Sequence, residues 1–93
     1  MIIVWSDEAK KAYKTIIDTL LDNWPNKIAL DFEQETNKLL DKLLQNNKLC
    51  PATKYKKLRK CVLHKNVSLI YKINRKNIEI VTFIFNKDNH HFY

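Results

Sequence analysis

Residues 54–85 read KYKKLRKCVLHKNVSLIYKINRKNIEIVTFIF and contain three runs rich in Val, Ile, Leu, Tyr and Phe, separated by short breaks that contain Asn. The runs cover residues 58–64, 67–73 and 78–85. Runs of this length and composition are typical of strands, and the short breaks favour an antiparallel meander.

Alternation within the runs indicates which strand lies inside the sheet. In the run 67–73 it predicts one core face and one partly covered face, with Ser68 and Ile70 on the second. The run 78–85 is apolar on both sides, which suits an interior strand. Its expected sides are Ile78, Ile80, Thr82 and Ile84 against Val81, Phe83 and Phe85. An interior strand needs a second neighbour, and residues 2–5 (IIVW) are the remaining candidate.

Two helices are expected between the first strand and the meander. Ser6 is a good N-cap, and Asp7 and Glu8 follow it where the helix dipole favours negative charge. Apolar residues then recur with helical spacing at Ala9, Ala12, Tyr13, Ile16, Ile17, Leu20, Leu21 and Trp24. Pro25 ends this helix at about residue 23, and a second helix is expected over about 26–45. The short connection predicts a helical hairpin that covers one face of the sheet, with Leu30 exposed.

Length and composition support an α+β fold in a single domain over residues 1–93. No apolar run reaches the roughly 18 residues of a membrane span, and the N-terminal MIIVW lacks a basic leader, so we expect a cytoplasmic protein without membrane contact. Cys50 and Cys61 lack metal-ligand spacing. We therefore expect reduced thiols, no disulfide and no metal.

Glycine is absent from the chain. We expect the turns to use Asn, which tolerates left-handed backbone angles better than other non-glycine residues. Phosphate-cradling glycine loops are excluded, so a nucleotide cofactor or small-molecule substrate is not expected.

Positive charge is concentrated in the second half of the chain. Residues 1–50 carry seven Lys and eight acidic residues, whereas residues 51–93 carry eight Lys and two Arg against Glu79 and Asp88. Such asymmetry indicates an anionic partner, either nucleic acid or an acidic protein segment, although a solvated basic face without a partner remains open. The densest cationic cluster is Lys54, Lys56, Lys57, Arg59 and Lys60. It suits phosphate contact, or protection of an edge strand by lysine.

The order strand, helix, helix and three-strand meander, with WSDEA (residues 5–9) opening the first helix, resembles the RelE/ParE superfamily of bacterial toxins over nearly the whole chain. The matching segments are RKCVL (59–63), SLIYKI (68–73) and IEIVTF (78–83). Where family members commonly carry a segment like FWDNRQ, this chain has FIFNKD (83–88). Asn86 keeps its type, Lys87 replaces the arginine, and Phe85 departs from the acidic residue.

The resemblance implies a type II toxin that inhibits growth, takes part in plasmid stabilisation, and is held inactive by a cognate antitoxin whose C-terminal segment wraps its sheet and helices. RelE-like members cut messenger RNA in the ribosome with a cluster of Lys and Arg and a C-terminal Tyr or His. ParE-like members lack that cluster and inhibit DNA gyrase.

Positions of this sequence bear on the two activities. Aligned on Tyr71, the basic positions of RelE-like members fall on Cys61 and Leu63, while Arg59 matches a basic position of both branches. We therefore expect ParE-like inhibition of gyrase, with the cationic cluster and Lys87 contacting the target. Two alternatives stay open. One is a metal-independent, ribosome-dependent endoribonuclease using Arg59, Lys87 and either His90 or His91, and the other is a non-toxic basic nucleic-acid-binding module.

Overall fold

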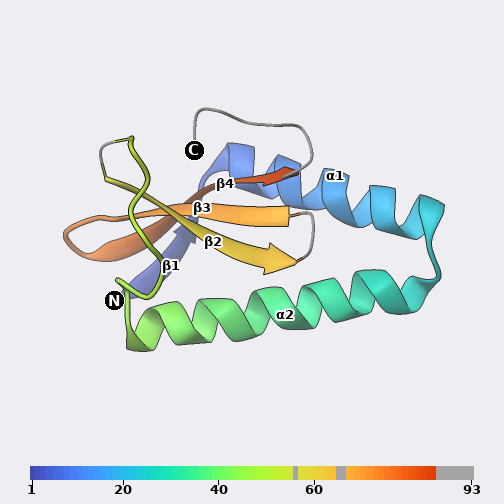
Figure 1. Cartoon of the computed structure of the whole chain (residues 1–93), viewed down its shortest axis with the longest axis horizontal. Coiled ribbons are helices and arrows are strands. Elements are labelled where there is room, and N and C mark those ends of the chain that lie inside the picture. Colours follow the sequence, from blue (N-terminus) through green and yellow to red (C-terminus); the bar gives the residue numbers. More distant parts are fainter. Residues whose placement is uncertain (56, 65–66, 86–93) are drawn as a thin grey trace.

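The computed structural model describes residues 1–55, 57–64 and 67–85. Its elements follow the expected order (Figure 1). They are β1 (Ile2–Trp5), α1 (Asp7–Asn23), α2 (Asn26–Gln45), β2 (Leu58–His64), β3 (Val67–Ile73) and β4 (Asn77–Phe85). The predicted α+β architecture is confirmed.

The sheet has the strand order β1-β4-β3-β2. Strand β1 runs parallel to β4, and the other neighbours are antiparallel, so β4 lies in the interior as predicted. Ser6 joins the first strand to the first helix. Its hydroxyl accepts a hydrogen bond from the Ala9 backbone N–H at 2.9 Å and donates one to the Val81 carbonyl at 2.7 Å. The N-cap of α1 is therefore tied to the central strand of the sheet.

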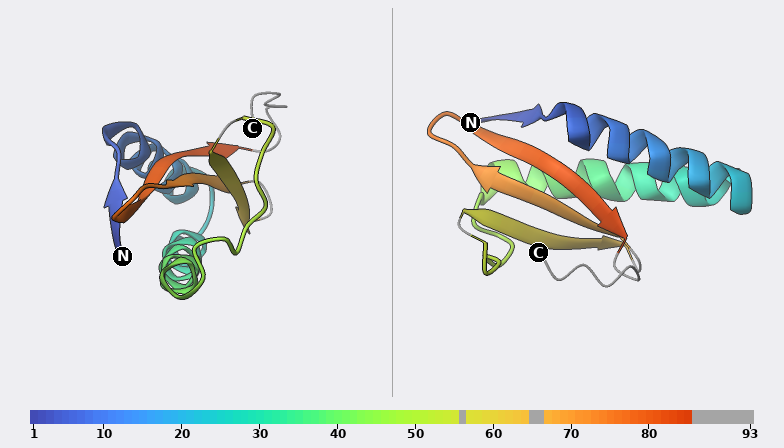
Figure 2. Two further views of the ribbon diagram at one scale, coloured as in Figure 1. Left: turned by 90° about the vertical axis from the view of Figure 1, so that its left-hand side faces the viewer. Right: turned by 90° about the horizontal axis from the view of Figure 1, so that it is seen from above.

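Helices α1 and α2 form an antiparallel hairpin against one face of the sheet (Figures 1 and 2). The core joins this face to the inner sides of the helices, with Ile16, Phe32 and Tyr71 among its largest members. The far end of the hairpin projects beyond the strands (Figure 2). Within the described residues, neither helix is long and apolar enough to cross a membrane.

The projecting end explains why the apolar stripe of α1 is not buried throughout. Leu21 is 46% exposed and Trp24 is 52% exposed, although both follow the spacing of the buried residues. The expected exposure of Leu30 is confirmed at 56%. Periodicity identified the correct face of the helix, but it carries no information on where the sheet beneath that face ends.

The predicted sides of β4 are partly wrong, because a register shift lies between Ile70 and Tyr71 of the β3–β4 ladder. Ile80 pairs with Tyr71 and Thr82 pairs with Ile70, which leaves Val81 as an extra residue in β4. The bulge reverses the alternation after Ile80. Phe83 therefore joins Ile78 and Ile80 in the core, whereas Thr82 and Ile84 share the opposite face.

The opposite face of β3 is also more deeply buried than expected. Ser68 and Ile70 both have no exposed surface. Each has a cross-strand neighbour on both sides, since Ser68 pairs with Val62 and Ile84, and Ile70 pairs with Lys60 and Thr82. Neighbours on both sides restrict access of water to these side chains within the sheet, and alternation alone does not predict burial this deep.

Cys50 and Cys61 form a disulfide, so the expectation of reduced thiols is wrong for this structure. After α2 the chain turns and forms an antiparallel bridge between Ala52 and Arg59. In that register Cys50 lies opposite Cys61, with 5.3 Å between their Cα atoms, which is a suitable separation for a disulfide. The pairing arises from the hairpin and is not visible in the spacing of the two cysteines.

The turns use Asn less than expected at left-handed positions. Among the described residues, Lys57 is the one with a positive φ, at 69°. Asn74 contributes by hydrogen bonding instead, since its side-chain amide donates to the Asn77 side chain at 2.9 Å and to Glu79 at 3.2 Å.

Candidate functional site

Residues 51–55 and 57–60 belong to a hairpin, here called the basic hairpin, whose second arm is the beginning of β2 and whose first arm lies along the outer edge of that strand. Two backbone hydrogen bonds close it, from the Thr53 N–H to the Leu58 carbonyl at 2.9 Å and from the Lys60 N–H to the Pro51 carbonyl at 3.2 Å. The described cations that it carries are Lys54, Lys57, Arg59 and Lys60. The predicted cationic cluster thus occupies one structural unit at the side of the sheet.

Within this unit Arg59 and Lys60 point to opposite faces of β2. Arg59 pairs with Tyr71 of the core face, and Lys60 pairs with Ile70 of the other face. The Arg59 guanidinium donates a hydrogen bond to the Cys50 carbonyl at 2.7 Å. One donor of Arg59 is therefore engaged in holding the start of the hairpin.

Tyr71 completes this anchor from below. Its hydroxyl donates to the Asn47 carbonyl at 2.8 Å and accepts from the Cys50 N–H at 3.4 Å. Burial raises the pKa of Tyr71 above its ordinary value, and the Cys50 hydrogen bond and the Arg59 charge oppose that rise. Tyr71 is thus a neutral donor at physiological pH, and it acts here as a structural anchor.

Lys54 and Lys60 are brought together by the hairpin. They line a shallow hollow of about 510 Å³, whose other walls are Pro51, Ala52, Thr53 and Val62. Lys57 is exposed on the hairpin as well. The ammonium groups of Lys54 and Lys60, beside an exposed Val62, can contact an acidic or phosphate-bearing surface.

Four of the predicted site residues lie outside the described residues: Lys56, Lys87, His90 and His91. The structure does describe Cys61 and Leu63, the two positions that distinguish the expected gyrase inhibition from RNA cleavage. Cys61 is 2% exposed and bonded to Cys50, and Leu63 is half-buried against the core.

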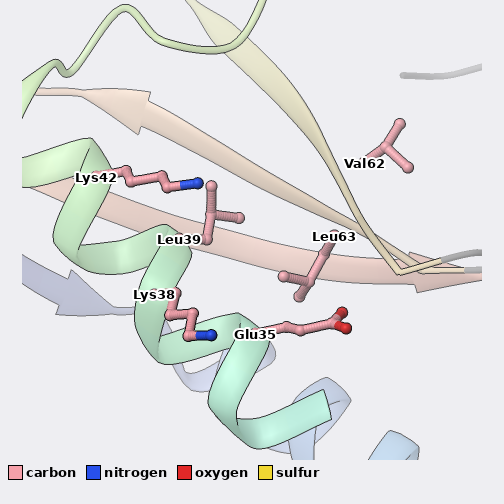
Figure 3. A pocket seen from close by; sticks show the side chains of 6 residues that line it. All are labelled: Glu35, Lys38, Leu39, Lys42, Val62 and Leu63. Carbon is pink, nitrogen blue, oxygen red and sulfur yellow. The ribbon is translucent and has the colours of Figure 1, made fainter. Parts of the chain in front are cut away.

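A cleft of about 220 Å³ separates α2 from β2 (Figure 3). Helix α2 contributes Glu35, Lys38, Leu39 and Lys42, and β2 contributes Val62 and Leu63. Leu63 points toward the helix and Val62 points away from it (Figure 3). In the described part of the chain, no backbone segment pairs with the outer edge of β2 beyond Lys60. The cleft therefore combines apolar walls, two lysines, one glutamate and, among the described residues, an unpaired strand edge.

Sequence reasoning missed this cleft because it named neither Lys38 nor Lys42 as a candidate site residue. Their i, i+4 spacing places both on one side of α2. What the sequence does not show is that the edge of β2 lies opposite that side.

A second apolar hollow, of about 490 Å³, lies where the helical hairpin projects beyond the sheet. It is lined by Ile17, Leu21, Asn26, Lys27, Ala29, Leu30 and Glu33. Its exposed leucines add to the apolar surface on which a protein partner could pack.

In the part of the chain that the structure describes, no three His, Cys, Asp or Glu side chains lie close enough together to bind a metal ion. The arrangement offers cations, apolar hollows and a strand edge. Such features suit contact with a macromolecule.

Comparisons with known proteins bear on the family and the fold. The family model described as "ParE toxin of type II toxin-antitoxin system, parDE" matches residues 3–88. Among the curated proteins that were searched, none matches the chain.

Several solved structures share the fold. A chain of the chromosomal ParDE toxin-antitoxin system from P. aeruginosa superposes with a TM-score of 0.78 at 19% identity, covering 91% of this chain and 95% of that one. The YoeB dimer from Staphylococcus aureus gives a TM-score of 0.66 at 17% identity, with 91% and 95% covered. The E. coli DinJ-YafQ complex gives 0.57 at 18% identity, with 98% and 97% covered.

Proposed function

This chain belongs to the ParE toxin family of type II toxin-antitoxin systems, and on that premise we propose that it stops growth by blocking DNA gyrase without cutting a nucleic acid. The membership confirms the predicted resemblance to RelE/ParE toxins. The choice of gyrase as target rests on one observation, the state of Cys61 and Leu63.

Cutting RNA through its 2'-hydroxyl requires a base for that hydroxyl, cations for the phosphorane and an acid for the leaving oxygen. At the positions where RelE-like members carry basic residues, this chain has a sulfur held in a disulfide and a leucine packed on the core. Neither group can neutralise a phosphorane. Arg59, which matches both branches, already donates to the Cys50 carbonyl.

The exposed cations support a binding role. Lys54 and Lys60 share one hollow, and Lys57 is exposed on the same hairpin. We propose that this face of the basic hairpin contacts the target, where long-range attraction between charges would speed association.

We also propose a cognate antitoxin as partner, and cytoplasmic action in plasmid stabilisation. The cleft between α2 and β2 suits an antitoxin segment. Its free strand edge can pair with the extended backbone of that segment, and Lys38 and Lys42 can contact acidic side chains of the antitoxin. Changing both lysines to Glu is expected to weaken rescue by the co-expressed antitoxin while leaving growth arrest intact.

The target is tested with the purified chain in two reactions run side by side. One measures supercoiling of relaxed plasmid by gyrase, and the other measures the length of messenger RNA in a translating extract. We expect loss of supercoiling and full-length RNA. Intact supercoiling with ribosome-dependent RNA cleavage would assign the RelE-like activity instead, and no effect in either reaction would favour a non-toxic binding module.

Two pairs of variants separate the mechanisms further. The double change His90→Ala and His91→Ala should leave growth arrest intact, whereas a folded variant without toxicity would indicate a nuclease.

Changing Lys54 and Lys60 to Ala should weaken gyrase inhibition at least about tenfold at low salt. The matched control changes Lys10 and Lys11, two exposed lysines of α1, and should have little effect.

A further inference from the structure

The disulfide between Cys50 and Cys61 encloses the whole basic hairpin in a covalent ring. The sequence separation of the two cysteines is 11 residues, and the segment between them is residues 51–60. The described cations of the proposed target surface all lie inside this ring. No other cysteine is present in the sequence, so this bond is the one covalent link between the hairpin's two ends besides the chain itself.

We propose that Cys50–Cys61 is a site of reversible thiol–disulfide exchange with a cellular dithiol, and that exchange controls how firmly the first arm of the basic hairpin is held against β2. The inference rests on the proposed function in one respect. A protein that acts on gyrase or ribosomes works where thiol reductants keep most cysteines reduced, and disulfides found there are commonly transient or redox-sensing.

The two sulfurs differ in access, which sets the order of the exchange. Cys50 is half-buried, while Cys61 lies on the core face of the sheet and is 2% exposed. A thiolate of the dithiol attacks the Cys50 sulfur, the bond to Cys61 breaks, and Cys61 leaves as a thiolate. The second thiolate of the reductant then attacks its own sulfur in the mixed disulfide and releases Cys50. Two electrons pass to the chain, the dithiol becomes a disulfide, and both cysteines take up protons.

After reduction, hydrogen bonds are what the described residues offer to hold the hairpin. The two arms are joined by the Pro51–Lys60 and Thr53–Leu58 backbone bonds, Tyr55 bonds to Leu58 and Thr53 in the turn, and Cys50 bonds to the Arg59 guanidinium and the Tyr71 hydroxyl. The backbone bonds lie at the exposed edge of the sheet, where water competes for them. Lys57 has a left-handed backbone, which is unfavourable for a residue with a Cβ atom, so opening of the loop would relieve this conformation. Opening of the hairpin should therefore depend strongly on the bridge.

Limited trypsin digestion of the full chain, with and without dithiothreitol, measures this opening. Closing a ring of this size restricts the opened chain by a factor on the order of a hundred. We expect cleavage after Lys54 and Lys57 to become at least about tenfold faster on reduction, because cleavage follows the population of the open form. Lys76, exposed in the turn between β3 and β4, is the internal control and should be cut at an unchanged rate.

A double variant, Cys50→Ala with Cys61→Ala, should show the fast rate with or without dithiothreitol. Equal cleavage of oxidised and reduced wild type after Lys54 and Lys57 would overturn the proposal. So would a bridge that stays oxidised in excess dithiothreitol without denaturant, measured by alkylation and mass. The wild-type comparison remains decisive if the double variant does not fold. Gyrase inhibition is a separate measurement, so failure of the proposed thiol–disulfide exchange and failure of the proposed target can be told apart.

Discussion

Replacing Tyr71 with Phe tests whether the hydroxyl beneath the basic hairpin holds the preceding loop in place. The ring of Tyr71 has no exposed surface, so the change removes a hydroxyl and leaves the packing in place. The lost hydrogen bond to the Asn47 carbonyl is 2.8 Å long, whereas the one from the Cys50 N–H is 3.4 Å long and contributes little. Asn47 is half-buried, so water can reach its carbonyl only in part. We expect the free energy of unfolding to fall by about 1–2 kcal/mol.

Urea unfolding followed by tryptophan fluorescence measures this change. Asn47→Ala is the matched control, because it keeps the backbone carbonyl that accepts the bond and removes the side chain. It should change the free energy of unfolding by less than about 0.5 kcal/mol. A Tyr71→Phe variant as stable as wild type would refute the assignment of Tyr71 as an anchor.

Wild type and the Tyr71→Phe variant are also expected to differ less in stability at high pH. Burial raises the pKa of Tyr71 above 10.0 in the folded state, and the Cys50 hydrogen bond and the Arg59 charge lower it in part. The folded chain therefore holds the proton more tightly than the unfolded chain. Stability from this source is complete below pH 10.0 and is lost as the pH rises through the folded pKa. Since Phe does not titrate, the advantage of wild type over Tyr71→Phe should shrink above pH 10.0.

Three further substitutions have measurable outcomes. Removing the disulfide with Cys50→Ala and Cys61→Ala should lower the free energy of unfolding by about 3 kcal/mol in non-reducing urea titrations, and dithiothreitol should bring wild type to the same value. Lys57→Gly should raise the melting temperature, because glycine relieves a φ of 69° worth about 1 kcal/mol, whereas Lys57→Ala should not. Ser6→Ala should lower the free energy of unfolding by about 1–2 kcal/mol through loss of the α1 cap, and Ser6→Thr should retain most of it in thermal melts.

The elements of the fold were predictable because their signals are local. Ser6 and Pro25 mark helix ends through their own chemistry, and the runs of β-branched residues mark the strands. The errors come from register and from spatial neighbours. The bulge at Val81 depends on how β3 and β4 align, which no single strand reveals.

The site was predictable to a smaller extent for the same reason. The cationic cluster was visible because its members are adjacent in sequence. The opposite orientations of Arg59 and Lys60 follow from strand pairing, and the pairing of the two cysteines follows from the hairpin. The cleft between α2 and β2 joins segments that are distant in the chain.

The parallel pairing of β1 with β4 has a consequence for how the protein is made. The hydrogen bond from Ser6 to the Val81 carbonyl joins residues 75 positions apart. On a translating ribosome, β1 emerges before β4 and cannot form this pairing until β4 has followed. The sheet therefore cannot close until β4 has been made, and a nascent chain cut short before β4 would lack the interior strand that joins β1 to β3.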